Sequence, residues 1–536
     1  MRSECLPFSQ IPHTTPLFTD FLSYQPKLHR FYPHSPFFSE WMSDEAATIR
    51  YESGRRQQIS NILDRQNRSW EASAAVTNNI NRLRNGALTV LTGQQVGLFG
   101  GPLFSIYKAL TAVKLADLAT RSGVDCVPVF WLATEDHDLA EVNHTYFAGT
   151  DGLQQLMVSS HSVLDAPVGT VTFGDEISSV TELAATVLGD TQITQALRES
   201  YRSGETFGTA FARLFAKLFA DWGVILLDAS DPELHRIAEP IYRAALERAA
   251  ELDDSLLTRG KELEAAGYHQ QVKVTPSSTL LFTRRDGARV AVHRRSNSAE
   301  HLLIEKEDVP LPEMLSRISS SPESFSPNVL LRPVVQDYLL PTLAYTGGAA
   351  EVAYFAQAAV VYEKLLGRVT PIVPRFSATI VDSKARTLLD RYHLNLGDLF
   401  PGPEPLRERL AEHALPSELQ ASFDQANASL QASMSAIRNS LSHLDKTLVD
   451  AAQNAESKMQ HQLESLRARA ARAELRQSEV LGRHAALLSN SLYPNRVLQE
   501  REIAGVYFLS RQGPELLRQL YDWIHTDCLD HQVISL

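Results

Sequence analysis

Between residues 87 and 133, an apolar strand, a glycine-rich turn, a helix and a second apolar strand follow one another. The predicted strands span residues 87–91 and 127–133. The predicted helix spans residues 103–119, where apolar residues recur at three- and four-residue steps. This order is typical of an α/β fold, whose sheet presents ligand sites at the carboxyl ends of its strands.

The chain has 536 residues, enough for two or three domains. We predict an α/β core over residues 1–381, with insertions at about 150–205 and 268–325. A helical coiled-coil domain is predicted over residues 382–490, and residues 491–536 are expected to pack back on the core.

Local patterns predict further elements of the core and its insertions. A helix is expected over residues 44–83, with a break near residues 65–67, and residues 168–173 alternate like a strand. Residues 272–283 and 288–293 are two strand-like runs joined by Arg-Asp-Gly, which is typical of a hairpin turn.

A long stretch without helix breakers sets the last third of the chain apart. Between Pro416 and Gly482, 65 residues include neither proline nor glycine. Apolar residues recur there every three or four positions, from Leu419 to Ala473, as in a coiled-coil seam. One unbroken helix would reach about 100 Å, and a hairpin folded near residues 453–454 would reach half of that. Both forms need a partner surface for the seam.

The bulk composition excludes several classes of protein. A net charge of -12 argues against nucleic-acid binding. Three distant cysteines, Cys5, Cys126 and Cys528, exclude a disulfide framework and favour the cytoplasm. We find no signal peptide and no apolar stretch of the length that a membrane span needs.

The turn before the helix is the first candidate binding element. It lacks the Walker pattern, because no Gly-Lys-Ser or Gly-Lys-Thr follows it. Backbone N–H groups at Gly97, Gly100 and Gly101 would let an anion approach the start of the helix, and Gln94 and Gln95 add donors and acceptors. The alternative is a tight turn that binds no ligand, in which glycine is needed only because the backbone adopts positive φ angles.

Titratable residues follow the second strand. Glu135, Asp136, His137 and Asp138 are consecutive, and burying all four would be costly. A carboxylate beside a histidine orients the ring and keeps it a competent base. Together with His144, seven residues further on, the cluster predicts catalysis or substrate binding. Two histidines seven residues apart with neighbouring carboxylates are weak evidence for a metal site. The remaining alternative is that these polar residues only mark the solvent-exposed end of the strand.

A third candidate segment begins at Arg332, whose planar guanidinium suits a carboxylate or a phosphate. Gly347 and Gly348 lie between a predicted strand and a helix, where a ligand can approach closely. Glu351 and Tyr354 share one helix face. The alternative is that Glu351 only caps this helix and Tyr354 belongs to the core.

Together these motifs resemble the cysteine ligase family of bacillithiol biosynthesis. The resemblance covers nearly the whole chain in the expected order. It is carried by residues 92–98, 101–103, 128–131, 135–138, 143–144, 332–333, 336–337, 340–342, 347–348, 351–354, 374–375 and 498–501.

The resemblance implies a Rossmann-like parallel-sheet core with two connective insertions and a helical coiled coil that supports a homodimer. It also implies that L-cysteine is joined to the amine of glucosaminyl-malate, in the last step towards bacillithiol. The candidate base is then His137, supported by Asp136 or Asp138. ATP or another nucleotide would activate the carboxylate, and no metal is predicted.

The expected contacts follow from the three segments and this reaction. Expected substrate contacts are Gln94, Gln95, Glu135, His144, Arg332, Gln336, Glu351, Tyr354 and Arg375. Expected nucleotide contacts are Gly93, Gly97, Gly100, Gly101, Gly347 and Gly348. Two other functions stay open: a nucleotidyltransferase or synthetase-like enzyme that activates another carboxylate, and a non-enzymatic coiled-coil scaffold that senses a metabolite. The predicted active site requires that the glycine turn, the titratable cluster and the segment that begins at Arg332 meet at one cleft.

Overall fold

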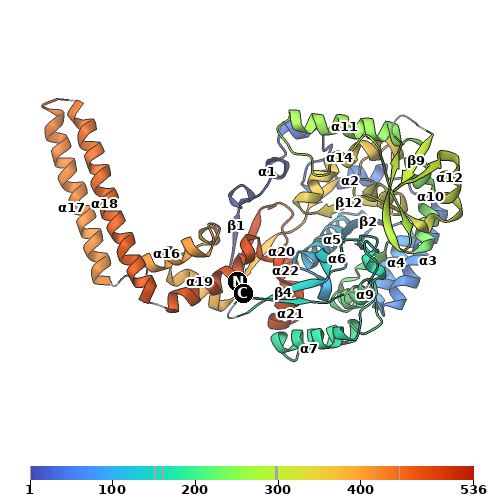
Figure 1. The fold of residues 1–536 in the computed structure, drawn as a ribbon, viewed down its shortest axis with the longest axis horizontal. Coiled ribbons are helices and arrows are strands. Elements are labelled where there is room, and N and C mark those ends of the chain that lie inside the picture. Colours follow the sequence, from blue (N-terminus) through green and yellow to red (C-terminus); the bar gives the residue numbers. More distant parts are fainter. Residues whose placement is uncertain are drawn as a thin grey trace.

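The computed structural model describes residues 2–149, 152–159, 162–295, 300–413, 415, 417–445, 447–477 and 479–536. An α/β body carries a helical arm that projects away from it (Figure 1). The two termini lie beside each other on the body, because strand β1 (Arg2–Leu6) pairs antiparallel with strand β15 (His531–Ser535). None of the described helices has the length and apolar content that crossing a lipid bilayer requires.

A five-stranded parallel sheet forms the centre of the body. Its order is β6 (Ile225–Asp228), β3 (Cys126–Leu132), β2 (Leu88–Gln94), β12 (Thr342–Gly347) and β13 (Ile372–Pro374). Numbered along the chain this is 3-2-1-4-5, the Rossmann order, which confirms the predicted fold class. The order reverses between β2 and β12, so a crevice opens at the carboxyl ends of these two strands.

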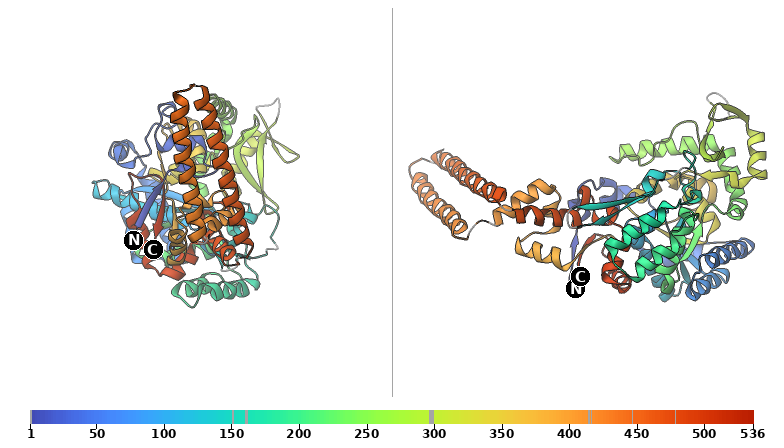
Figure 2. Two further views of the ribbon diagram at one scale, coloured as in Figure 1. Left: turned by 90° about the vertical axis from the view of Figure 1, so that its left-hand side faces the viewer. Right: turned by 60° about the horizontal axis from the view of Figure 1, so that its bottom comes forward.

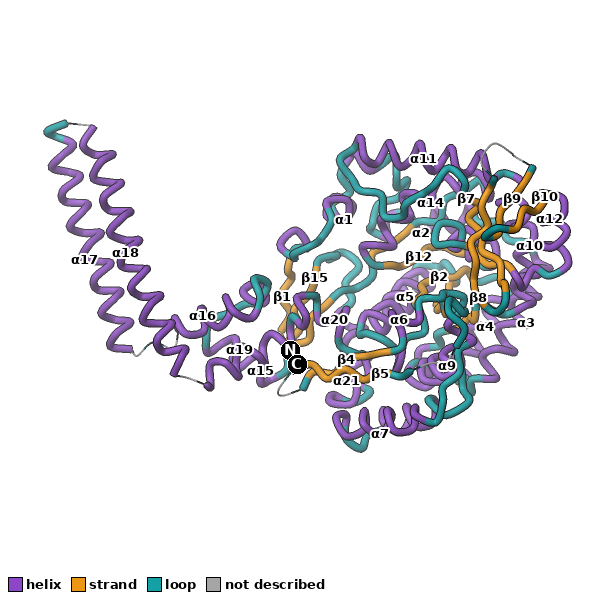
Figure 3. Tube along the Cα trace, viewed as in Figure 1, coloured by secondary structure: helices purple, strands orange, loops and turns teal. Residues whose placement is uncertain are grey.

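Alternating side chains of β3 serve two cores, one on each face of the sheet. Val129 and Trp131 belong to the first core, whereas Phe130 and Leu132 belong to the second. The first core is covered by α10 (Pro232–Glu247) and α14 (Ala349–Leu366), and the second by α5 (Phe104–Arg121) and α9 (Phe207–Leu218). The helices on both faces are visible in Figure 3.

The first insertion holds the hairpin β4 (His144–Ala148) and β5 (Leu153–Met157), followed by helix α7 (Glu176–Leu188). The strand predicted at residues 168–173 is wrong, because Val168–Thr170 is a 3-10 turn. Its backbone N–H groups bond the loop after β3 instead: Val168 N donates to Asp136 O at 2.6 Å.

The second insertion is a five-stranded antiparallel sheet of order β10-β9-β8-β7-β11, which includes β9 (His301–Ile304), β10 (Glu307–Pro310) and β11 (Phe325–Pro327). The predicted hairpin is confirmed, since β7 (Ser278–Arg285) and β8 (Ala288–Arg294) flank a two-residue turn. Both turn residues have positive φ, 50° at Asp286 and 86° at Gly287, as this type of hairpin turn requires.

The predicted helix break near residues 65–67 is also wrong. Helix α3 (Ser53–Ser69) runs through this segment, because Asn67 is buried and its side-chain amide bonds the backbone of Leu226 in β6 as well as the Leu63 carbonyl one turn earlier in the helix. The predicted helix is interrupted at residues 49–52, between α2 (Met42–Thr48) and α3, and again after Ser69. Ser73 then caps α4 (Ala74–Arg84) by accepting from the N–H of Val76.

The arm is a hairpin of two long helices, α17 (Ser417–Ser442) and α18 (Thr447–Gln477). It is joined to the body through α16 (Pro403–His413) and α19 (Glu479–Leu492) (Figure 2). A fold near residues 453–454 is wrong, because α18 continues through them. Helix α18 begins at Thr447, before the predicted position of the turn, and the carboxylate of Asp445 caps it by accepting from the N–H of Thr447.

The hairpin does not cover its own apolar side chains. Met434 and Ala452 are buried between the helices, but other seam residues stay outside. The exposed ones are Leu419, Ile437, Leu444, Leu448, Met459 and Leu466. An uncovered apolar stripe of this kind is typical of a surface that binds a partner.

Candidate functional site

A cavity of about 680 Å³ lies at the carboxyl ends of β2, β3 and β12. All three segments singled out in the sequence contribute to its lining, and so does Arg501 near the C-terminus. Of the predicted site residues, those that line it are Gly93, Gln94, Gln95, Gly97, Asp136, His144, Arg332, Gln336, Gly348, Glu351, Tyr354 and Arg375. The required meeting of the three segments is therefore present at the switch point of the sheet.

A buried ion pair joins the two sides of this switch point. Lys108, on the first turns of α5, is 4% exposed. Its Nζ lies 2.7 Å from Glu351 Oε2, and it also donates to the Gly93 carbonyl at 2.8 Å and to Gln94 Oε1 at 3.0 Å. Burial lowers the pKa of Lys108, and Glu351 opposes this change.

Glu351 has two roles in the structure. Its Oε2 accepts from the Gly348 N–H at 2.8 Å, so it caps α14 as the alternative interpretation held. It also accepts from Tyr345 Oη at 2.6 Å and pairs with Lys108. Burial alone would raise its pKa, but the ammonium of Lys108 and the hydrogen bonds from Tyr345 and Gly348 together outweigh burial, and the pKa of Glu351 lies below its ordinary value. The site therefore holds a fixed negative charge at the start of this helix.

Carboxylates and an imidazole line the opposite side of the cavity. The side-chain amide of Gln95 donates to Asp136 Oδ2 at 3.0 Å and to Glu141 Oε2 at 2.7 Å, and so holds the two carboxylates together. His144 Nδ1 lies 3.3 Å from Asn143 Oδ1. An amide oxygen accepts only from a protonated nitrogen, so this contact leaves Nε2 of His144 as the proton acceptor.

The other members of the titratable cluster point elsewhere. Among the described residues that line the cavity, Glu135, His137 and Asp138 are absent. The ring of His137 faces the second insertion, where its Nδ1 lies 3.3 Å from a guanidinium nitrogen of Arg289. A guanidinium only donates, so Nδ1 accepts in this contact; the same Nδ1 also lies 3.7 Å from Asp136 Oδ1, so the predicted neighbour of His137 is close to its ring. This geometry favours His144 over His137 as a base.

Glu135 turns into the body and forms a buried network. Its Oε1 lies 3.3 Å from His235 Nε2, and His235 Nδ1 lies 3.1 Å from Tyr242 Oη. Burial raises the pKa of Glu135 to about 8, and burial lowers the pKa of His235 to about 4. At neutral pH both groups are therefore mostly uncharged, so their contact is not an ion pair.

The backbone N–H groups that were expected to bind an anion are hydrogen-bonded within the glycine turn itself. Gly97 donates to Gln95 O, Gly100 to Gly97 O and Gly101 to Leu98 O. Gly100 and Gly101 have φ angles of 85° and 70°, which side chains rarely adopt. The structure thus agrees with the alternative interpretation, a tight turn. Cationic side chains remain as the groups that would face an anion.

Three arginines supply positive charge to the cavity. Arg332 donates to Tyr354 Oη at 3.1 Å. Arg375 is held by Glu500, whose Oε1 lies 2.6 Å from its guanidinium. Glu500 also accepts from Ser377 Oγ and Ala378 N, so a residue of the C-terminal segment orients a cation in the site. Arg501, the next residue, lines the cavity itself.

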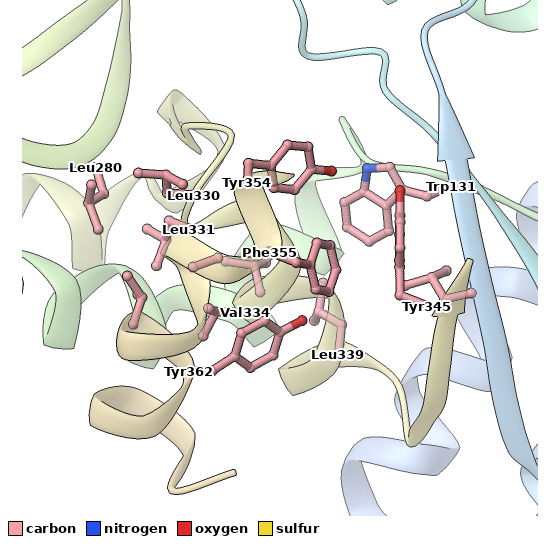
Figure 4. Close-up of a cluster of buried hydrophobic side chains, with 14 of the residues drawn as sticks. Trp131, Leu280, Leu330, Leu331, Val334, Leu339, Tyr345, Tyr354, Phe355 and Tyr362 are labelled. Carbon is pink, nitrogen blue, oxygen red and sulfur yellow. The ribbon is translucent and has the colours of Figure 1, made fainter. Parts of the chain in front are cut away.

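An aromatic wall completes the cavity. Trp131 of β3 and Tyr345 of β12 come from the two strands that flank β2, and the hydroxyl of Tyr354 points toward Trp131 (Figure 4). The indole N–H of Trp131 is buried, and no described residue accepts its hydrogen bond. A buried donor without a partner is costly, so a ligand acceptor in the cavity would satisfy it.

Sequence reasoning missed several of these side chains. Lys108 sits in an apolar helix and was not assigned a role, although one lysine among residues that face a core was a usable signal. The contact of Arg289 with His137 had no local signal, because 152 residues separate them. In the parts of the chain that the structure describes, no three His, Cys, Asp or Glu side chains form a metal-ligand group.

The comparisons with known proteins agree with this architecture. Residues 1–376 match the family model described as bacillithiol biosynthesis BshC, N-terminal Rossmann-like domain, and residues 378–536 match its C-terminal coiled-coil domain. The chain therefore belongs to the BshC family of bacillithiol biosynthesis.

Curated relatives extend over the full chain. A protein of Koribacter versatilis is 47% identical over 537 residues and one of Solibacter usitatus is 37% identical over 538 residues, with both chains covered completely in each case. A protein of Salinibacter ruber is 31% identical and covers 99% of this chain. Each carries the name "Putative cysteine ligase BshC". Membership of this family makes the chain a ligase-family enzyme.

Proposed function

We propose that the chain joins the carboxylate of L-cysteine to the amine of glucosaminyl-malate, the last step towards bacillithiol. One observation supports this most: a single cavity has arginines on one side and carboxylates with an imidazole on the other. A substrate with malyl carboxylates and an ammonium group needs both kinds of partner. The names of the relatives support cysteine as the other substrate.

The cationic side binds the malyl group in this proposal. Arg332 and Arg375 face its carboxylates with their planar guanidinium groups. Glu500 and Tyr354 keep these two cations oriented before the substrate arrives, which lowers the entropic cost of binding. The indole N–H of Trp131 donates to an oxygen of the bound substrate.

The acidic side receives the amine. Asp136 and Glu141 attract the ammonium form, and Gln95 fixes both carboxylates. His144 takes the proton from the ammonium at Nε2, which leaves a neutral amine as the nucleophile. The geometry around His137 makes it a positioning residue next to Arg289 in this scheme.

Amide formation also needs an activated carboxylate, because oxide is a poor leaving group. A nucleotide such as ATP supplies this activation when bound. Because the N–H groups of the glycine turn are engaged and Arg332 and Arg375 face the malyl group, Arg501 is the third arginine of the described cavity lining and would face the negative charge of a nucleotide.

Mass-spectrometric detection of product from the purified chain tests the proposal. Cysteine and glucosaminyl-malate are supplied with ATP, with other nucleotides, and with none. We expect the amide product only with a nucleotide. Equal product without nucleotide would remove the activation step, and no product under any condition would favour a synthetase-like enzyme acting on another carboxylate.

A further inference from the structure

Two cysteines that lie at opposite ends of the sequence meet in the structure. Cys5 Sγ, on β1, lies 3.0 Å from Cys528 Sγ, in the loop between α22 (Glu515–Trp523) and β15. Cys5 is exposed and Cys528 is half-buried, so solvent reaches the pair. The two sulfur atoms are closer than non-bonded contact, and a movement of about 1 Å would bring them to the ~2.05 Å of a disulfide.

The surrounding backbone holds the two cysteines in place. Cys5 is opposite Gln532 in the β1–β15 ladder, and Asp530 Oδ1 accepts from the N–H of Phe8 at 3.4 Å. Beside Cys528 lies a cavity of about 340 Å³, lined also by Phe8, Asp527 and Asp530. A small molecule can therefore reach the Cys528 sulfur, and the two aspartates favour one without negative charge.

We propose that Cys5 and Cys528 are a redox modification site, at which a low-molecular-weight disulfide without negative charge drives formation of a reversible bond between the two ends of the chain. This inference does not depend on the ligase reaction. It differs from a structural disulfide, because both thiols are free in the structure.

The exchange proceeds in two steps. The thiolate of Cys528 attacks one sulfur of the small disulfide, forms a mixed disulfide and expels one small thiolate. Cys5 then loses its proton to solvent and attacks the Cys528 sulfur, which expels the second thiolate. Two protein thiols are oxidised and one small disulfide is reduced to two thiols. The hydrogen bond with Cys528 and burial raise the pKa of Cys5 to about 11, so Cys5 reacts second.

The bond would restrain more than the termini. Strand β15 pairs with β14 (Ala378–Val381), and Ser377 and Ala378 hold Glu500 against Arg375 of the cavity. A covalent tie between β1 and the loop before β15 therefore braces the strands that orient a cation in the site. Closing a loop of this length also stabilises the folded chain, so its thermal midpoint should rise on oxidation.

Treatment of the reduced full-length chain with cystamine tests the proposal. After acid quenching and denaturation, we expect one of three thiols to remain titratable, a loss of two hydrogens in intact mass, and a peptide that links Cys5 to Cys528. Cys126 is the internal control, because it is buried in the core and stays reduced. Dithiothreitol should restore all three thiols and lower the thermal midpoint again.

Two variants separate the steps. Cys5→Ser should keep a cysteamine adduct on Cys528, and Cys528→Ser should give neither a link to residue 528 nor a rise in the thermal midpoint. Three titratable thiols after treatment of the unsubstituted chain, a lasting adduct on it without the linked peptide, or a bond between two chains on a non-reducing gel would each overturn the proposal.

Discussion

Lys108 Nζ and Glu351 Oε2 lie 2.7 Å apart in the buried crevice between β2 and β12. The pair joins the helix after the first strand of the sheet to the helix after the fourth. Both helices also pack on the cores of the sheet, and this pair adds a direct polar link between them at the cavity.

Removing one partner should therefore damage stability as well as activity. We expect Lys108→Met to lower the free energy of unfolding by about 3 kcal/mol, because a buried carboxylate loses its counter-charge. The double variant Lys108→Met with Glu351→Gln should recover most of this loss, because no charge is left unpaired. Urea titration measures both, and equal losses in the single and double variants would contradict the pairing.

Glu135 should make the stability of the chain depend on pH. Its pKa of about 8 in the fold exceeds its ordinary value, so between pH 6.5 and 8 the folded chain retains a proton that the unfolded chain has lost. Stability then falls as pH rises, by about 2 kcal/mol over this window. Below pH 6.5 the low pKa of His235 acts in the opposite direction, because the unfolded chain binds the extra proton.

The variant Glu135→Gln should abolish this decline and leave stability flat from pH 6.5 to 8. Glu141→Gln, a nearby carboxylate at the surface, should keep it. Thermal midpoints measured across the pH range compare the three proteins. A decline of unchanged slope in Glu135→Gln would place the titrating group elsewhere.

Trp131→Phe should weaken substrate binding without unfolding the chain. Phenylalanine keeps one aromatic ring and lacks the N–H, which has no partner in the described protein, but it is smaller than the buried indole, so we expect a stability loss of about 1–2 kcal/mol from the space that it leaves. The missing hydrogen bond should raise KM about fivefold for one substrate. Tyr362→Phe is the matched contrast, because its hydroxyl donates to Pro333 O at 2.8 Å within the core. It should cost stability and leave KM unchanged.

The two histidines of the site can be separated by kinetics. His144→Gln should reduce product formation by at least ~100-fold, as expected for loss of a general base. His137→Gln should reduce it less than ~10-fold, because this ring lies outside the cavity. The reverse order would return the base to His137.

The arm should hold two chains together through its exposed apolar stripe. Ile437→Glu with Leu466→Glu places charges on side chains that are 47% and 57% exposed, and we expect monomers in sedimentation. Ser435→Glu with Gln462→Glu adds the same charges at exposed polar positions, and this variant should still sediment with the mass of a dimer. An unchanged mass in the first variant would mean that the stripe does not pair.

Much of the fold was predictable because periodicity and glycine positions are local signals. The two strands around the glycine turn, the hairpin at Asp286 and the long helices of the arm all followed from them. The break in the helix after residue 44 was misplaced, because Asn67 looks like a breaker until β6 is there to bond it. The turn of the arm had no glycine or proline to mark it.

The site was predictable in outline only. The three segments were identifiable because polar residues and glycines followed apolar strands. Which way each side chain points depends on contacts across the fold: His137 is turned by Arg289, and the glycine turn satisfies itself. The contact between Cys5 and Cys528 could not be predicted, because 523 positions separate the two residues in the sequence.

The chain departs from the α/β body after β14 and rejoins it at α20 (Gln499–Glu502), and these two points touch. The side chain of Gln499 accepts from Ile380 N at 2.7 Å and donates to Ile380 O at 2.8 Å. The arm therefore begins and ends at the same place on the α/β body, and its length can change without moving the body that holds the cavity. A truncation at residue 377, between the two family-model matches, would instead strip away Val506 and Leu517, which cover the second core, and would leave its apolar face in water.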